Sequence, residues 1–390
     1  MITKLAFRNI RGAGLRTWIN VFILSIVYVT IIWFEGLYCG WVNQAENDMI
    51  DWEIGGGQVV VAGYDRFDPF SWDDAHAPLP ASVEQLRVDG QAAAILVSSG
   101  VVYPQGRRQS VLLKGIDTRQ RVLAIPTDSM AVTDGKVPIV LGQRMAHSLD
   151  VQQGDSFTMK WRTAGGAFDA GDVTVACIMR TTVPAVDTGQ IWLSLEDLQR
   201  MKELPGEATY AVLAIKSEEP TTPDNWRWED TDFLLSNLRA IMKSEAAGEY
   251  IIFAMLLFMA MIAIFDTQVL SLFHRRREMG TLLALGLTRR QLIRLFTLEG
   301  VLHAVLAIVM AAAWGTPLLW YFGTEGWKLP EFYDEYGMAG MSGTLIFDYS
   351  VGLVVRTIIL VVFITTVVSW WPTRRIARLK PTDALRGKLS

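Results

Sequence analysis

The residues whose types and spacing could do chemistry lie mainly in one basic segment between two apolar runs. Residues 274–299 read HRRREMGTLLALGLTRRQLIRLFTLE. An excess of basic residues in a short loop between membrane spans marks the cytoplasmic side. The chemistry on offer is recognition through charge, so we expect a partner on that side to dock here. The basic residues are Arg275, Arg276, Arg277, Arg289, Arg290 and Arg294.

The same segment carries signals for the end of one helix and the start of another. Gly286 takes the left-handed conformation that closes a helix more readily than any other residue type. Thr288 lies three residues before Gln291, which is a capping-box spacing. We therefore predict a helix, a turn at Gly286 and a second helix that begins after Thr288.

Residue patterns for catalysis or metal binding are missing from the sequence. It contains no G-x-x-x-x-G-K-[ST] loop, no G-x-S-x-G and no H-E-x-x-H. The histidines lack metal-ligand spacing. We predict that the chain is not an enzyme and holds no metal or cofactor. The histidines are His76, His147, His274 and His303.

Ionisable residues inside apolar runs are costly and often functional. Glu35 and Arg356 each lie six residues from the outer end of their runs, so their depths match. Asp266 and His303 also lie at similar depths, with Glu299 closer to the surface. We predict two pairs across helices, Glu35 with Arg356 and Asp266 with His303. The alternative is that each group snorkels or faces a watery crevice.

Four apolar runs set the elements that position these residues. Each is near or above the ~20 residues needed to cross a ~30 Å hydrocarbon core. Four spans place both termini on one side of the membrane. The runs are Trp18–Trp41, Tyr250–Phe273, Leu298–Phe322 and Ser350–Trp371.

Basic residues near both termini agree with the basic connector on orientation. The tail contains six basic residues and only one acidic residue, Asp383. The net charge of −4 for the whole chain does not reveal this local excess of positive charge. We predict that both termini are cytoplasmic. The basic residues are Lys4, Arg8, Arg11 and Arg16 before the first run, and Arg374, Arg375, Arg378, Lys380, Arg386 and Lys388 in the tail.

The first apolar run is longer than that of a signal peptide and lacks a clear cleavage site, so we expect an uncleaved helix. Residues 1–17 before it place Ile2, Ala6 and Ile10 on one helical face, opposite basic residues. That pattern suits an amphipathic helix along the inner membrane surface. A short solvated tail is the alternative.

Residues 43–249 are predicted to form an α/β domain outside the cytoplasm. Short β-rich runs alternate there with turn signals and helical patterns. Cys39 and Cys177 make no disulfide framework. The expected strands are Gln58–Ala62, Ala93–Val97, Ser110–Lys114, Pro138–Leu141, Val173–Ile178 and Tyr210–Ile215. The expected helices are Ala81–Arg87, Arg144–Leu149, Leu195–Lys202 and Asp230–Ala246.

The predicted fold class is a membrane protein with four transmembrane α-helices and a large α/β extracytoplasmic domain inserted between helices 1 and 2. The predicted order is an N-terminal helix (1–17), span 1 (18–42), the external domain (43–249), span 2 (250–273), a cytoplasmic coupling segment (274–297), span 3 (298–322), an external loop (323–349), span 4 (350–371) and a cytoplasmic tail (372–390).

Several motifs carry a resemblance to a known family. Residues 277–292, REMGTLLALGLTRRQL, are similar to the signature of FtsX-like, MacB-type ABC transporter permeases. The tail at 372–387, PTRRIARLKPTDALRG, resembles the ending of the same family. Two shorter matches lie in the external domain, at 139–155 and 191–198. The sequence is thus identified as a member of that family.

The resemblance implies a permease in the bacterial inner membrane whose large domain is periplasmic. It implies a separate ABC ATPase subunit in two copies, which binds the ATP and Mg, and a second permease chain, identical or homologous. It also allows a periplasmic carrier or adaptor. Membrane lipids are expected to surround the spans, and no nucleic-acid partner is expected.

In this family the connector resembles a coupling element that inserts into a groove on the ATPase. The alternative is that the arginines only anchor the helix ends to anionic headgroups. The residues that the resemblance assigns to ATPase coupling are Arg277, Glu278, Thr281, Leu282, Leu285, Gly286, Thr288 and Arg289.

Apolar side chains in the outer halves of spans 1 and 2 are candidates for a cavity that accepts acyl chains. Ordinary lipid-facing or interhelical packing is the alternative for each of them. The candidates are Trp33, Phe34, Leu37 and Tyr38 on the first span, with Ile251, Phe253, Met255 and Phe258 on the second.

Within the family, residues 57–64, GQVVVAGY, resemble a segment of the lipoprotein-releasing (LolC/LolE type) permeases, although Gly57 replaces the His of that pattern. This favours extraction or release of lipoproteins or other lipidic cargo. Two alternatives stay open. One is a tripartite efflux permease of the MacB type, which usually carries a fused ATPase. The other is an FtsX-like, non-transporting activator of a cell-wall hydrolase.

Overall fold

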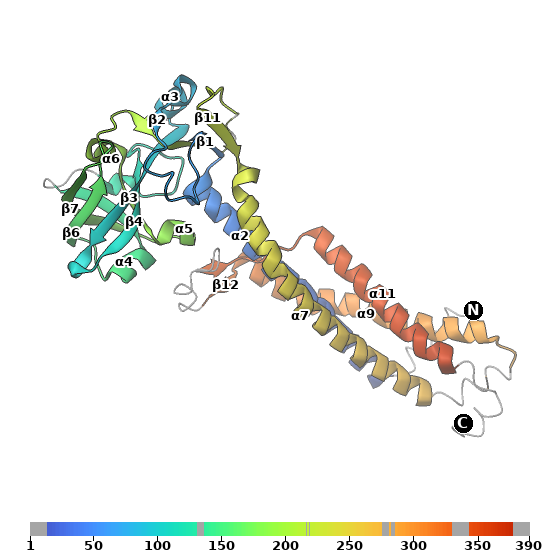
Figure 1. Ribbon diagram of the computed structural model, residues 1–390. Helices are drawn as coiled ribbons and strands as arrows, with labels where there is room; N and C mark the ends of the chain where they lie inside the picture. Colours follow the sequence, from blue (N-terminus) through green and yellow to red (C-terminus); the bar gives the residue numbers. More distant parts are fainter. Residues whose placement is uncertain are drawn as a thin grey trace. The chain divides into compact units, whose positions relative to one another are not determined.

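Four long helices and a sheet-rich domain make up the computed structural model of the chain (Figure 1). It describes residues 14–130, 136–215, 217, 219–274, 281, 285–329 and 343–376. Contacts divide the chain into two compact units, which we describe separately. The first comprises 1–41, 243–327 and 345–390, and the second comprises 42–242 and 328–344.

The long helices follow the apolar runs of the sequence. They are α2 (Leu15–Met49), α7 (Thr231–His274), α9 (Arg289–Thr324) and α11 (Val351–Ile376). Among the described residues, three segments are long and apolar enough to cross a membrane: Thr17–Ile54, Arg289–Thr324 and Val351–Arg374. The chain is therefore a membrane protein, and its fourth span, expected within α7, stays a prediction.

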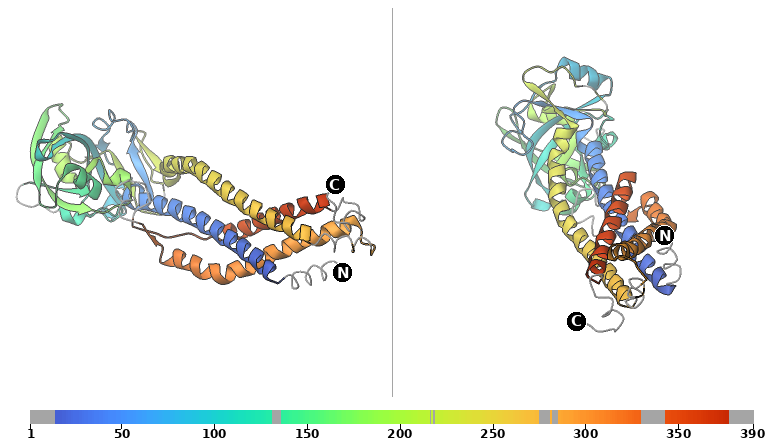
Figure 2. Two further views of the ribbon diagram at one scale, coloured as in Figure 1. Left: turned by 90° about the horizontal axis from the view of Figure 1, so that it is seen from below. Right: turned by 90° about the vertical axis from the view of Figure 1, so that its right-hand side faces the viewer.

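Close packing holds α2, α9 and α11 together in the first unit (Figure 2). Gly315 of α9 lies against Val29 of α2 so tightly that an added Cβ would be 2.4 Å from the Val29 side chain. Small residues permit such approaches between membrane helices. The shared apolar cluster consists of Val21, Leu24, Tyr28, Val29, Ile31, Ala307, Ala311, Val361 and Val368.

The second unit is built on a mixed nine-stranded sheet in the order β11-β1-β10-β3-β4-β8-β5-β7-β6. An additional antiparallel pairing of β3 with β6 closes β3, β4, β8, β5, β7 and β6 into a barrel. The strands are β1 (Gly57–Val61), β3 (Ala92–Tyr103), β4 (Gln109–Ile116), β5 (Val137–Gly142), β6 (Ser156–Arg162), β7 (Phe168–Met179), β8 (Gln190–Ser194), β10 (Tyr210–Leu213) and β11 (Trp226–Asp230).

Shorter elements complete the fold. The helices are α3 (Ala81–Val88), α4 (Gln143–Leu149), α5 (Pro184–Asp187) and α6 (Leu195–Lys202), with a π-helical turn at Ile50–Ile54 and 3-10 turns at Pro104–Gly106 and Thr127–Met130. The two-residue strands are β2 (Ala77–Pro78), β9 (Glu207–Ala208), β12 (Trp327–Lys328) and β13 (Thr344–Leu345).

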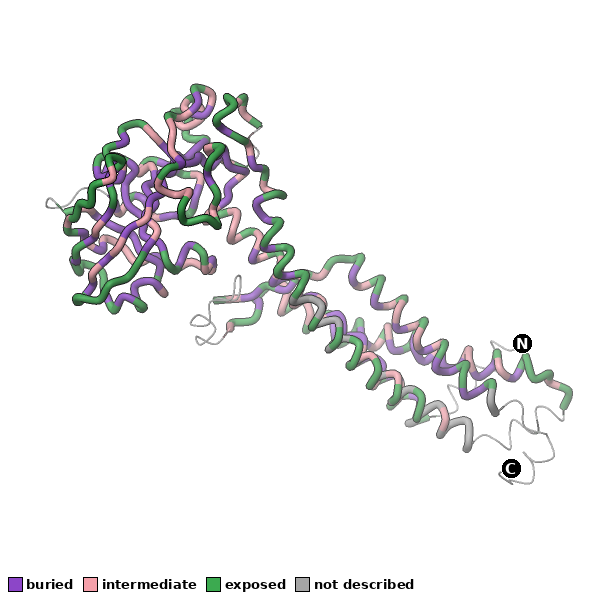
Figure 3. Tube along the Cα trace, viewed as in Figure 1, coloured by how far each residue is buried: buried purple, intermediate pink, exposed green. Residues whose placement is uncertain are grey.

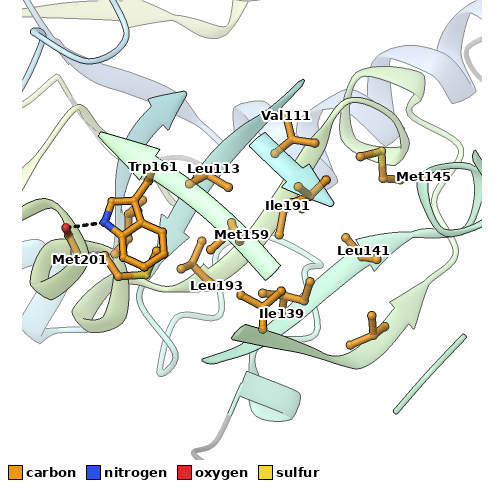
Figure 4. Packing of buried hydrophobic residues seen from close by; sticks show 14 of the residues in the cluster. Val111, Leu113, Ile139, Leu141, Met145, Met159, Trp161, Ile191, Leu193 and Met201 are labelled. Carbon is orange, nitrogen blue, oxygen red and sulfur yellow. Dashed lines mark hydrogen bonds between the residues drawn. The ribbon is translucent and has the colours of Figure 1, made fainter. Parts of the chain in front are cut away.

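The barrel interior is filled by the inward-facing side chains of alternate strand positions (Figure 4). Leu113 and Ile191 are fully buried, as is Met159. Trp161 donates its indole Nε1 proton to the Met201 carbonyl oxygen at 2.8 Å, which ties β6 to α6. Figure 3 shows the same burial along the chain trace. The barrel is thus a packed core and not a pore.

A buried ion pair joins the end of α6 to the segment that precedes β2. The Nζ atom of Lys202, a residue only 2% exposed, lies 2.8 Å from Asp73 Oδ1. Ser98 donates to the same oxygen at 2.7 Å, and the Ser99 hydroxyl donates to Oδ2. Burial alone would raise the pKa of Asp73, but hydrogen bonds from Lys202, Ser99 and Ser98 and the Lys202 charge lower it below its ordinary value.

The structure extends or joins several predicted elements. The sequence separated a helix at 230–246 from a span at 250–273, whereas α7 is continuous from Thr231 to His274. The helix α11 continues past the predicted limit of 371 to Ile376. Strands β6, β8 and β11 were not among the predicted strands. The predicted N-terminal helix up to residue 13, and the tail from 377, lie outside the described residues.

The substitution Lys202→Met should destabilise the second unit. It leaves the Asp73 carboxylate largely buried without its cation, which breaks a pair whose loss typically costs about 3–5 kcal/mol when burial is complete. Because Asp73 keeps 19% side-chain exposure, we expect roughly 2 kcal/mol. Hydrogen exchange of β3 and α6 amides in the full-length protein measures this loss.

The pH dependence gives a second readout. Without Lys202 the folded-state pKa of Asp73 should rise above its unfolded value of ~3.9. The loss should therefore be full at neutral pH and shrink as pH falls toward 4, because the carboxyl protonates. Lys136→Met, at an exposed lysine of the same unit, is the matched control and should change little. An equal loss at both pH values would contradict the assignment.

Candidate functional site

The connector between α7 and α9 is partly described, and its described part has the predicted turn. The backbone N–H of Leu285 donates to the Thr281 carbonyl oxygen at 2.9 Å. Gly286 then adopts φ of 98°, a conformation that non-glycine residues rarely take. The candidates Arg277, Glu278 and Leu282 lie outside the described residues.

The predicted capping box at the start of α9 is confirmed. The backbone N–H of Gln291 donates to Thr288 Oγ1 at 3.3 Å, and the Thr288 N–H donates to Gln291 Oε1 at 2.8 Å. These two bonds satisfy backbone donors that a helix start leaves free. They fix Arg289 as the first residue of α9.

The described connector side chains face solvent. Leu285 is 78% exposed, and Thr281, Thr288 and Arg289 are exposed as well. The first turn of α9 has no acidic residue and begins with two arginines. Positive charge at a helix N-terminus opposes the helix dipole. Helix stability therefore does not explain these arginines.

The predicted outer ion pair is present in the first unit. A guanidinium nitrogen of Arg356 on α11 donates to Glu35 Oε1 on α2 at 3.0 Å. The hydroxyl of Thr357 donates to the other carboxylate oxygen at 3.3 Å. The Glu35 side chain is 19% exposed and that of Arg356 is 69% exposed. The pair thus joins two apolar helices, and the sequence analysis missed Thr357, whose only signal is its place beside Arg356.

The predicted pair of Asp266 with His303 was wrong. The Nδ1 atom of His303 lies 2.7 Å from the Glu299 carbonyl oxygen, one turn earlier on the same helix. His303 is 6% exposed, whereas Asp266 on α7 is exposed. Matching depth therefore did not bring the two side chains together, because the His303 ring turns to its own backbone.

Trp33, one of the apolar candidates, belongs to an aromatic cluster. It packs against Phe34, Phe322 and Phe347 at ring-centroid distances of 5.1, 5.7 and 5.2 Å. These rings join α2, α9 and the segment before α11. The sequence analysis missed Phe322 and Phe347.

The other apolar candidates differ in how far they are exposed. Leu37 and Tyr38 on α2 are half-buried, and Tyr38 packs on Trp41 with ring centroids 6.0 Å apart. On α7, Ile251, Met255 and Phe258 are 64%, 62% and 56% exposed. The Phe253 side chain lies outside what the structure describes. A shared acyl-chain cavity therefore stays a prediction.

The second unit displays an ordered aromatic loop that sequence analysis also missed. Phe67 and Phe70 are 71% and 89% exposed. Their backbone N–H groups donate to Asp65 Oδ1 at 2.9 Å and Asp68 Oδ1 at 3.0 Å. Hydrogen bonds thus hold the backbone that carries the two exposed rings. The signal in the sequence was that one Asp precedes each Phe by two positions, Asp65 before Phe67 and Asp68 before Phe70.

Among the residues that the structure describes, no group of three or more His, Cys, Asp or Glu is arranged to hold a metal ion. The described geometry supplies recognition groups: cations and an apolar side chain on the connector, an ion pair between helices, and exposed rings on the second unit. These groups can bind other molecules through charge and apolar contact.

Comparisons with known proteins place the chain beside membrane permeases. Residues 250–381 match the family model described as FtsX-like permease C-terminal. Two curated relatives, the lipoprotein-releasing system transmembrane protein LolC of Xylella fastidiosa strains Temecula1 and 9a5c, are each 22% identical over 329 residues. Each match covers 75% of this chain and 77% of the relative.

A solved structure also matches part of the chain. It is the extracellular domain of the noncanonic ABC-type transporter YknZ from Gram-positive bacteria, at 14% identity and a TM-score of 0.24. The match covers 41% of this chain and 83% of that one. A TM-score this low supports no conclusion about the fold.

Exchanging the charges of the outer pair tests whether it stabilises the helix contact. Glu35→Arg and Arg356→Glu each leave two like charges together, and each should lower the thermal unfolding midpoint by about 4 °C. The double exchange should restore at least half of that loss. The measurement is thermal unfolding of the full-length chain in lipid nanodiscs.

The control is Thr357→Val, which removes one hydrogen bond and leaves the charges, and should lower the midpoint by roughly half as much. If the double variant is as unstable as the sum of the two single variants, the pair does not stabilise the contact.

Proposed function

We infer, because this chain belongs to the FtsX-like permeases of ABC-type transporters, that it relays the motion of a separate ATPase to its extracytoplasmic domain. The observation that carries this proposal is the capped connector within the matched domain. Its turn at Gly286 and its cap at Thr288 present Leu285 and Arg289 to solvent at a fixed helix start.

The connector is the proposed docking element for the ATPase. Arg277 and Arg289 can bind carboxylates of a partner through charge-assisted hydrogen bonds, and Leu285 supplies an apolar contact. ATP and Mg bind to the partner and not to this chain. Because one chain offers one connector, two ATPase subunits require two permease chains, identical or homologous.

Two features support transmission along the helices. The helix α7 runs from Thr231 to His274, next to the connector, without a break. The Glu35–Arg356 pair ties α2 to α11, so a displacement of either helix acts on the other. In this proposal the substrate need not cross the bilayer, because the ATP-driven movement is delivered to the domain outside the cytoplasm.

The proposed cargo is a lipoprotein or another lipidic molecule in the inner membrane. Support comes from the similarity to LolC over three quarters of the chain. The aromatic loop of the second unit, with Phe67 and Phe70 exposed, is a candidate contact for the cargo or for a periplasmic carrier. A lipidic cargo carries apolar parts that must leave the membrane, and exposed aromatic rings can contact them.

Charge reversal in the connector should separate the chain from its ATPase. Arg289→Glu replaces a cation by an anion at an exposed helix start, and we expect at least a tenfold lower recovery of the ATPase with the tagged full-length chain. Lys243→Glu makes the same charge change at an exposed position of α7 and should leave recovery unchanged. Equal recovery with both variants contradicts docking at the connector.

Mass spectrometry of the tagged chain from its native host, purified in mild detergent, tests the cargo. We expect an ABC ATPase, a second permease chain and acylated lipoproteins. A periplasmic adaptor without acylated cargo indicates efflux instead, and a cell-wall hydrolase indicates signalling. If no ATPase is recovered under conditions that preserve such complexes, the relay itself is wrong.

A further inference from the structure

A groove between α9 and α11 lies beside the arginines of the α9 start. Its volume is about 590 Å³. Both helices belong to the first unit and pack together (Figure 2). None of the residues that line it is among those proposed to dock the ATPase. The lining residues are Arg290, Ile293, Arg294, Thr297, Leu298, Val301 and Trp370.

One end of the groove is strongly cationic. Arg290 and Arg294 are four residues apart, so they share one face of α9, and both are exposed. Among the described residues neither forms an ion pair. Arg374 adds a third cation, since its guanidinium carbon lies 5.1 Å from the Trp370 ring centroid. This end therefore attracts an anion, which the helix dipole also favours at the start of α9.

The other end of the groove is apolar, with Leu298 and Val301 in its wall. From Arg290 to Val301 the helix rises about 16 Å at 1.5 Å per residue. Half of a ~30 Å hydrocarbon core is about 15 Å. The whole groove, from its cationic end to its apolar end, is therefore about as long as one membrane leaflet.

A hydroxyl group in the groove wall has no hydrogen bond to the described residues. Among them, nothing pairs with the Oγ1 atom of Thr297. In α11, by contrast, Thr365 and Thr373 donate to the carbonyl four residues earlier. Because Thr297 lines the groove, its hydroxyl can donate to an ester or phosphate oxygen there.

We propose that this groove binds one anionic phospholipid of the leaflet at the connector side. The phosphate lies between Arg290 and Arg294, the glycerol ester region lies at Thr297, and an acyl chain covers Leu298 and Val301. Charge complementarity selects a lipid over an uncharged partner. The apolar length selects a lipid over a free anion, which would leave that wall uncovered.

The site is separate from ATPase docking, so the two ideas can fail independently. A bound lipid in this place would hold the first turns of α9 at the membrane surface. It would thereby set the depth at which the connector meets its partner.

Native mass spectrometry of the delipidated full-length chain, with dioleoyl-phosphatidylglycerol or dioleoyl-phosphatidylcholine added, measures binding directly. We expect at least tenfold preference for phosphatidylglycerol. Each of Arg290→Gln and Arg294→Gln should weaken its binding about fivefold, which corresponds to ~1 kcal/mol per charge at a membrane surface. Leu298→Trp, which fills the apolar part, should weaken binding while both arginines remain.

The matched control is Arg289→Gln, which removes a neighbouring charge that does not line the groove and should leave lipid preference unchanged. Equal binding of the two lipids, or an unchanged preference in the double variant Arg290→Gln/Arg294→Gln, overturns the proposal. So does displacement of the lipid by millimolar inorganic phosphate, which would make this an anion site only. Loss of binding when two copies of the chain associate would identify the groove as an interface between copies.

Discussion

The structure depends on one constraint, which is that a bilayer core offers no water to polar groups. Backbone N–H and C=O groups must pair inside each helix, and a charge must find a partner or reach the surface. Glu35 is the clearest case in the first unit. It lies on an apolar helix and receives hydrogen bonds from Arg356 and Thr357 of a second helix. The constraint thus turns a costly residue into a link between α2 and α11.

The same constraint makes the ends of the helices the places where charge can gather. Gly286 and Thr288 decide where α9 begins, and this start places Arg289, Arg290 and Arg294 at successive angles around one helix. Their charge opposes the helix dipole. We propose that one helix start serves two partners, in which Arg289 contacts the ATPase and Arg290 with Arg294 contacts a lipid.

Sequence information was sufficient where the determinants are local. Apolar runs of spanning length predicted the long helices, and the Thr288–Gln291 spacing predicted a cap that the structure contains. The Glu35–Arg356 pair was predicted from depth alone, and the structure contains it. The same reasoning failed for His303, whose own helix offered the Glu299 carbonyl. Barrel closure by β3 with β6, and the burial of Lys202 against Asp73, depend on residues far apart in the chain. Single-sequence patterns do not encode those contacts.

The continuity of α7 shows how a local signal can mislead and why the outcome matters for the proposed relay. The sequence analysis separated a helix at 230–246 from a span at 250–273, and Gly248 lies between the two. One Gly costs a helix interior only about 1 kcal/mol, which is too little to break α7. The 44 residues of α7 span about 66 Å at 1.5 Å per residue, more than twice the ~30 Å hydrocarbon core. The helix must therefore extend beyond the membrane whichever of its residues lie inside. A continuous series of backbone hydrogen bonds can transmit a displacement along that length. Gly248 has no side chain to restrict its backbone, so we expect α7 to bend there first.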